Sequence, residues 1–104
     1  MAKKNLPLCP ISRAAILLGS RWSLEILREF HQKGARKFQD LQNALSGIAP
    51  NTLSNRLKLF EDHELIERRF YEQHPPRAEY VLTDKGRRMG PIFRAIHDWD
   101  AEIS

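Results

Sequence analysis

The segment from Gly47 to Phe60 constrains the fold most, because it joins a tight turn to a strongly patterned helix. After the turn, Leu53, Leu57 and Phe60 recur at steps of four and three residues, which places them on one stripe of a helix. The opposite stripe carries short polar side chains that can bond to base edges or phosphates, namely Asn51, Ser54, Asn55 and Lys58. This pattern suits a helix in a DNA major groove. Taken alone, it also fits an ordinary amphipathic surface helix.

The preceding segments supply the remainder of a helix-turn-helix. Residues 39–45 predict a short helix with Leu41 and Leu45 facing inward, and Ser46–Ile48 form the turn before the patterned helix. We therefore expect a helix-turn-helix over residues 39–63. Residues 20–32 predict a longer helix whose apolar side chains spread around most of its circumference, so it should be central and buried.

After Leu65 the apolar period changes from 3.6 to 2, which predicts strands at residues 65–71 and 78–82. The residues between them include Pro75 and Pro76, which lack a backbone N–H, so we expect a long tip outside the ladder. A helix-turn-helix followed by a hairpin over residues 65–82 is a winged helix. The predicted fold is mainly α with a small β-hairpin (α+β), in a single domain over residues 1–104.

The two ends of the chain predict further helices. Residues 1–8 read as a flexible basic arm, and Cys9-Pro10 opens a helix over residues 9–18. Thr83 is a suitable N-cap for a last helix over residues 83–104, with a kink or break at Gly90-Pro91. Large apolar side chains on a terminal helix need a cover, and a second copy of the chain is the simplest one. The candidate dimer interface comprises Ile11, Met89, Ile92, Phe93, Ile96, Trp99 and Ile103. Docking onto the chain's own first helix is the alternative.

Candidate DNA contacts fall into three groups. The base readers at the start of the patterned helix are Asn51, Thr52, Ser54 and Asn55, flanked by Arg56 and Lys58. Arg56 lies between the stripes, where it either clamps a phosphate or braces the hairpin. Phosphate contacts are expected from the start of the short helix and from the hairpin tip, through Arg36, Lys37, Gln39, His74 and Arg77.

Charge and composition support a nucleic-acid partner. The 104 residues carry a net charge of +4, and residues 1–37 hold eight Lys/Arg against two Glu. No apolar run approaches the roughly 20 residues that cross a bilayer, and the basic start lacks the apolar core of a secretory signal. The single cysteine excludes an internal disulfide, so we expect a cytoplasmic protein with no membrane partner.

Cys9 is a candidate redox or electrophile sensor. At a helix N-terminus the dipole stabilises a thiolate, and Arg13 lies one turn away. The alternative is a small buried hydrophobe.

The four histidines are scattered, and the chain has no CxxC pair, Gly-rich phosphate loop or G-x-S-x-G motif. We therefore expect no metal site, no cofactor and no enzymatic activity.

Short motifs along the chain carry a resemblance to a known family. They are Cys9-Pro10, Leu18-Gly19-Ser20-Arg21-Trp22, Arg36-Lys37-Phe38-Gln39-Asp40-Leu41, Gly47-Ile48, Asn51, Leu53-Ser54-Asn55-Arg56-Leu57, Pro75-Pro76-Arg77-Ala78-Glu79-Tyr80 and Leu82-Thr83-Asp84-Lys85-Gly86. This ordered set resembles the HxlR-type winged-helix transcriptional regulators, relatives of the MarR group.

The resemblance implies a cytoplasmic homodimer, formed largely by the terminal helices, that binds palindromic operator DNA. In some members of the family the N-terminal cysteine, matched here by Cys9, senses thiol-reactive stress, which implies a small-molecule or oxidant effector. Ala49-Pro50 departs from the polar residues common in the family at the start of the recognition helix, so base preference does not carry over. A winged helix that binds a protein partner, without specific DNA binding, is the competing function.

Overall fold

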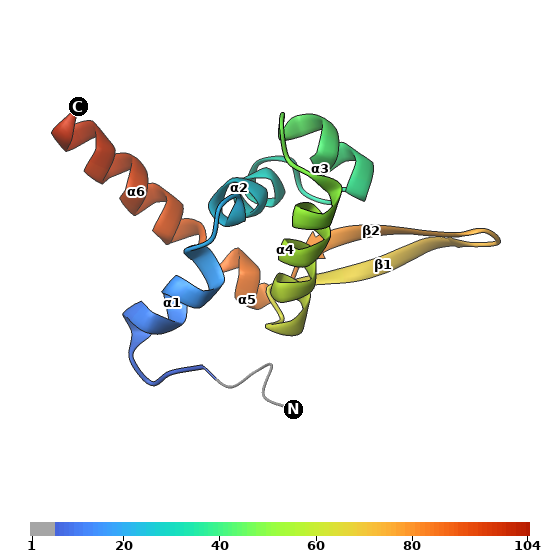
Figure 1. Cartoon of the computed structure of the whole chain (residues 1–104), viewed down its shortest axis with the longest axis horizontal. Helices are drawn as coiled ribbons and strands as arrows, with labels where there is room; N and C mark the ends of the chain where they lie inside the picture. Colours follow the sequence, from blue (N-terminus) through green and yellow to red (C-terminus); the bar gives the residue numbers. More distant parts are fainter. Residues whose placement is uncertain (1–5) are drawn as a thin grey trace.

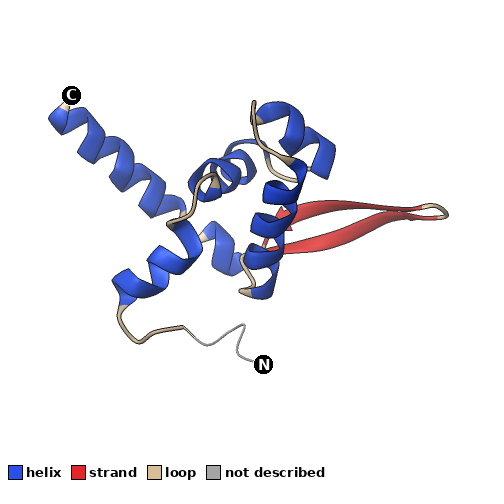
Figure 2. Ribbon diagram, in the orientation of Figure 1, coloured by secondary structure: helices blue, strands red, loops and turns tan. Residues whose placement is uncertain are grey.

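The computed structural model describes residues 6–104, which form short helices and one β-hairpin (Figure 1; Figure 2). In chain order the elements are α1 (Pro10–Leu18), α2 (Ser23–Lys33), α3 (Phe38–Ala44), α4 (Pro50–Asp62), β1 (Ile66–Gln73), β2 (Pro76–Leu82), α5 (Asp84–Arg87) and α6 (Gly90–Ile103). Most of the expected basic arm, at residues 1–5, lies outside the described residues. The helical body with a small hairpin is the winged-helix arrangement that the sequence predicts.

The core lies where α2, α3 and α4 meet, and α2 is its centre. Ile26, Leu27 and Phe30 of α2 are at most 1% exposed, and they pack with the inward residues of α3 and α4. Burying each such side chain contributes about 1.5–3 kcal/mol relative to leaving it in water. The apolar stripes predicted for the three helices therefore define one contiguous core.

The start of α2 differs from the expected one at residue 20. Trp22 adopts a left-handed backbone conformation, with φ at 80°, so Ser20–Trp22 turn before the helix begins at Ser23. This conformation is costly for a bulky residue. Trp22 packs against the core, and the guanidinium of Arg21 lies 4.0 Å from the centre of its ring. These contacts hold Trp22 in the turn.

The wing is longer and its tip shorter than the sequence predicts. β1 and β2 pair antiparallel from Ile66–Leu82 out to Gln73–Pro76, so the expectation that residues 72–77 stay outside the ladder is wrong. Both strands of a two-stranded ribbon are edges, where a proline is tolerated. The register shifts between Phe70 and Glu72, which leaves Tyr71 in a bulge.

The last helical region is interrupted, as Gly90-Pro91 predicts. Thr83 caps α5 by accepting a hydrogen bond from the Gly86 backbone N–H, and the chain turns at residues 88–89 before α6 begins. Pro91 occupies the first turn of α6, where its missing N–H is not needed. From there α6 projects away from the body, on the side opposite the wing (Figure 1).

Candidate nucleic-acid interface

Helix α4 presents a polar front on a fully anchored back. Leu53, Leu57 and Phe60 are at most 2% exposed and fix the orientation of the helix. The side chains on the opposite face are exposed, namely Asn51, Ser54, Asn55 and Lys58, while Thr52 is half-buried. The N-cap residue Ala49 provides no side-chain hydrogen bond. The first turn of α4 therefore keeps free backbone N–H groups at its start.

The Arg56 side chain of α4 forms a hydrogen bond within the protein. Its Nε donates to the backbone carbonyl of Arg21 at 2.9 Å, and its side chain is half-buried. The sequence left two roles for Arg56, a phosphate clamp or a brace for the hairpin. The structure shows a brace, but the partner is the turn before α2.

The Arg36 side chain is also largely buried and has partners within the protein. Its guanidinium is 3.6 Å from the carboxylate of Glu29 and donates to the backbone carbonyl of Asp40, and its side chain is only 15% exposed. Its backbone N–H and carbonyl both pair with Tyr80 of β2, at 2.9 and 2.7 Å. Arg36 therefore joins α2, α3 and the wing. We correct its predicted role from an exposed phosphate clamp to a structural link.

Lys37 and Gln39 are exposed at the start of α3. The Lys37 ammonium lies 4.9 Å from the centre of the Tyr71 ring, and its backbone N–H donates to the Asp40 carboxylate. Gln39 donates to the side chain of Asn43. The sequence analysis did not include Tyr71 in this surface, because its contact with Lys37 joins β1 to the start of α3 and no local pattern indicates it.

The wing tip carries His74 and Arg77, both exposed. Arg77 forms an ion pair with Glu72 at 2.7 Å, and Lys58 pairs with Asp62 at 3.4 Å. Exposed pairs of this kind contribute at most about 1 kcal/mol, so a phosphate competes with them readily. Arg68 and Arg69 of β1 are also exposed and add charge that the predicted site lacked.

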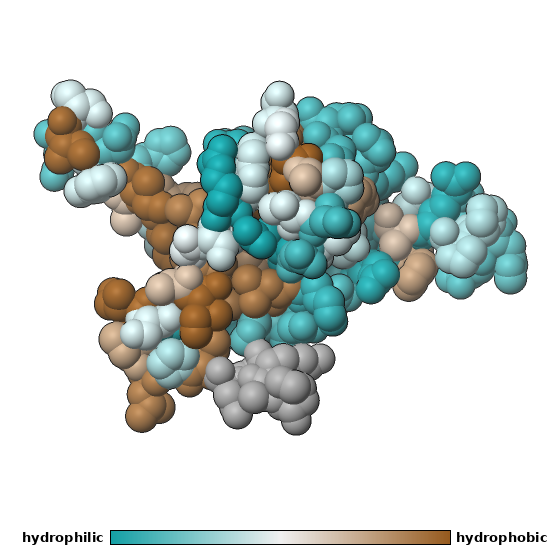
Figure 3. Space-filling model, in the orientation of Figure 1, coloured by the Kyte–Doolittle hydropathy of each residue, from teal (hydrophilic) through white to brown (hydrophobic). Residues whose placement is uncertain are grey.

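The candidate dimer residues divide between surface and core. Helices α1 and α6 contain no buried residue, and Ile11, Trp99 and Ile103 are 60–78% exposed. Ile92 and Ile96 are about 40% exposed, and Phe93 is half-buried against the core. Met89 is only 8% exposed and packs within the protomer's own core, so its predicted place at the interface is corrected. Figure 3 shows the apolar surface gathered over α1 and α6.

Cys9 is exposed and unpaired at the N-cap of α1, which excludes the buried alternative. The backbone N–H of Ser12, the Ser12 side chain and the backbone N–H of Ile11 donate hydrogen bonds that hold the pKa of the thiol below its ordinary value. Hydrogen bonds to the charged form stabilise a thiolate. The sequence pointed to the helix start, which contributes through the backbone N–H groups of Ser12 and Ile11, and to Arg13, in whose place the structure has the Ser12 side chain.

Other kinds of site find no support in the described part of the chain. Within residues 6–104, no three His, Cys, Asp or Glu side chains gather in a way that could hold a metal ion. None of the helices in this range has the length and hydropathy needed to span a bilayer.

The anchored recognition helix, the helix before it and the extended wing define a winged helix-turn-helix of the DNA-binding class. A family model described as HxlR-like helix-turn-helix matches residues 17–104. The uncharacterized HTH-type transcriptional regulator sll1512 of Synechocystis is 42% identical over 96 residues, covering 88% of this chain and 70% of the relative. The chain therefore belongs to the HxlR-like helix-turn-helix family, whose named members are transcriptional regulators and not enzymes.

Two solved structures agree with this assignment. A MarR-family transcriptional regulator from Porphyromonas gingivalis W83 superposes with a TM-score of 0.79 at 28% identity, covering 91% of this chain and 92% of that one. The reduced form of YodB from Bacillus subtilis gives 0.75 at 30% identity, covering 89% and 91%. YodB has also been solved after diamide treatment and with a bound quinone.

Proposed function

We propose that the protein is a homodimer that binds a pseudo-palindromic operator and regulates transcription from it. The observation that carries the proposal is the contrast between the two faces of α4. Its apolar back is at most 2% exposed, while Asn51, Ser54 and Asn55 face solvent. A helix held this firmly presents its polar side chains in a fixed geometry, as base recognition in the major groove requires.

The remaining contacts position the protein on the phosphate backbone. Lys37 and Gln39 at the start of α3 and Arg77 on the wing are exposed on the segments that flank α4. Contacts to phosphate fix register and orientation but carry no sequence information. We therefore assign base reading to Asn51, Ser54 and Asn55, and phosphate binding to Lys37, Lys58 and Arg77.

The homodimer is supported by the uncovered faces of α1 and α6. These helices contribute no buried side chain to the protomer, although Ile11, Trp99 and Ile103 are large and apolar. An apolar surface that continues over two helices marks an interaction site. In a two-fold dimer that binds two half-sites, the two copies of α4 would enter successive major grooves about 34 Å apart.

Cys9 is the proposed sensor residue. Its thiol is exposed, its pKa is lowered by the hydrogen bonds from Ser12, and it lies at the start of α1 beside the proposed interface. A thiolate is the reactive form toward oxidants and electrophiles. The diamide-treated and quinone-bound forms of the relative YodB support an effector of this chemical class.

The test is selection of bound duplexes from a random DNA pool, with and without oxidant. Asn55→Ala should lose tenfold or more of the discrimination between the selected and random duplexes. Arg77→Ala should weaken binding to both and lower the salt slope by about one. Equal binding of selected and random DNA by the unmodified protein, or a flat salt dependence, would favour a protein-binding module. Equal affinity with Cys9 reduced, oxidised or replaced by Ser would remove the sensor role.

A further inference from the structure

Lys37 differs from the other cations of the proposed DNA surface in the partner that holds it. Arg77 and Lys58 are paired with carboxylates, at 2.7 and 3.4 Å. The Lys37 ammonium instead lies 4.9 Å from the centre of the Tyr71 ring, and it takes part in none of the ion pairs within residues 6–104. A cation–π contact at this distance is attractive, yet it places no anion beside the ammonium. A phosphate can therefore bind Lys37 without displacing a carboxylate.

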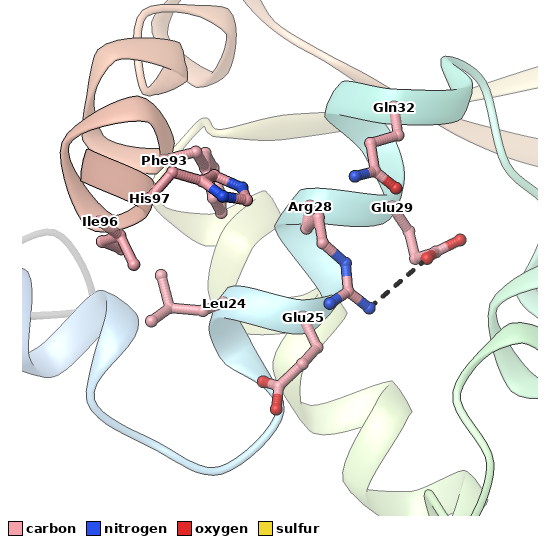
Figure 4. Close-up of a pocket in the computed structure, with 8 residues that line it drawn as sticks. All are labelled: Leu24, Glu25, Arg28, Glu29, Gln32, Phe93, Ile96 and His97. Atoms are coloured by element: carbon pink, nitrogen blue, oxygen red, sulfur yellow. Dashed lines mark ion pairs between the residues drawn. The ribbon is translucent and has the colours of Figure 1, made fainter. Parts of the chain in front are cut away.

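The backbone that carries Lys37 is held in place through its neighbour Arg36. Arg36 exchanges two backbone hydrogen bonds with Tyr80 of β2, and its guanidinium lies 3.6 Å from the carboxylate of Glu29. This carboxylate also forms an ion pair with Arg28, at 3.7 Å (Figure 4). The base of the Lys37 side chain is therefore fixed. The position of its ammonium depends on the flexible methylene chain and on the contact at the end of that chain.

We propose that Tyr71 is a positioning residue, whose ring holds the Lys37 ammonium where a DNA phosphate binds it. A lysine side chain loses rotamer freedom when it is immobilised at an interface, and a contact that restricts it beforehand removes part of that cost. Tyr71 belongs to β1 of the wing, and Lys37 is the N-cap of α3, the helix before the recognition helix. The pair therefore joins the wing and α3 at one phosphate contact. The role of Tyr71 rests on the proposed function in that duplex DNA is the ligand, but it requires no particular sequence.

The affinity of the whole protein for a random-sequence duplex is measured at several salt concentrations, because phosphate contacts carry no sequence information. Lys37→Gln should lower the salt slope by about one for each protomer bound. Tyr71→Leu should weaken binding by about threefold for each protomer, because the lysine must then be ordered by the DNA alone. Tyr71→Phe keeps the ring and should bind as the unmodified protein does. Adding Tyr71→Leu to Lys37→Gln should cause no further loss.

Phe70→Leu is the matched control. It removes an exposed ring from the neighbouring residue of β1, and this ring takes part in none of the cation–π contacts of the described residues. Any effect of Phe70→Leu should be the same in the unmodified protein and in Lys37→Gln. Only the effect of Tyr71→Leu should depend on whether Lys37 is present.

Three results would overturn the positioning role of Tyr71. Binding could be unchanged in Tyr71→Leu, or the loss could persist in the Lys37→Gln background, which would indicate a structural role. An equal loss in Tyr71→Phe would assign the effect to the hydroxyl and not to the ring. Failure to bind any duplex would overturn this role together with the proposed function. A protein that shows the dependence on Lys37 but prefers no selected duplex would support the role of Tyr71 and contradict the proposed operator recognition.

Discussion

Thr83 joins the end of the wing, the end of α4 and the start of α5, and its replacement by valine isolates the role of one hydroxyl. The Oγ1 atom accepts from the Gly86 backbone N–H at 3.1 Å. It also lies 2.5 Å from the Glu64 carbonyl oxygen and 3.1 Å from that of Leu65, so its proton is donated to this turn. Thr83→Val keeps the shape of the side chain and removes both functions.

The expected loss of stability comes from two comparable contributions. Removing an N-cap oxygen costs about 1 kcal/mol. Removing the donor to the Glu64 carbonyl costs about another 1 kcal/mol, because the Leu65 carbonyl keeps the Thr83 backbone N–H as a partner at 3.0 Å. Thr83→Val should therefore lower the free energy of unfolding by about 2 kcal/mol. Thr83→Ser keeps the hydroxyl and should cost less than about 0.8 kcal/mol for the lost methyl group.

Urea unfolding followed by circular dichroism measures both variants. The protein concentration must be fixed, because unfolding of a dimer depends on it. With a slope of about 2 kcal/mol/M, Thr83→Val should lower the midpoint by about 1 M. A midpoint within about 0.2 M of the unmodified protein would refute the reasoning. So would an equal loss in Thr83→Ser, because the methyl group and not the hydroxyl would then be responsible.

Two further predictions concern the side chains of Arg56 and Cys9. Arg56→Ala should lower the free energy of unfolding by about 1 kcal/mol, because the Nε of Arg56 donates to the Arg21 backbone carbonyl. The salt slope of DNA binding should stay unchanged. A salt slope lowered by about one, at unaltered stability, would show that Arg56 binds a phosphate instead. The rate at which iodoacetamide alkylates Cys9 should rise with pH around a midpoint below that of free cysteine, because the pKa of the thiol is lowered. Ser12→Ala should move that midpoint upward, and identical pH profiles would show that the Ser12 hydroxyl does not stabilise the thiolate.

The parts of the fold that the sequence predicts well are those governed by periodicity. The stripe of Leu53, Leu57 and Phe60 is fully buried, and α2 is the centre of the core. Burial of apolar surface dominates folding, so a regular apolar pattern reports it directly. The sequence also predicted the cap at Thr83 and the interruption at Gly90-Pro91. Both effects act within a few residues, since they depend on a side-chain cap and on the missing N–H of proline.

The features that the sequence missed depend on contacts between distant residues. Arg36 looks like a surface cation, but its pairing with Glu29 and Tyr80 joins segments that only the fold brings together. The left-handed Trp22 and the bulge at Tyr71 likewise depend on neighbours far away in sequence. The local pattern predicts a helix with a buried apolar back and an exposed polar front, whereas the ion pairs of the surrounding charged side chains become visible only in the structure.

Helix α6 is the element that a dimer partner would stabilise most. It spans 14 residues, and an isolated helix of this length is marginal in water. Its start is held by Phe93, whose ring centre lies 5.0 Å from that of His31, but Trp99 and Ile103 remain 60% and 61% exposed. A partner that covers these residues would stabilise the whole helix. Dimer formation and the helical order of α6 should therefore be coupled, so that each favours the other, because linkage between the two is reciprocal.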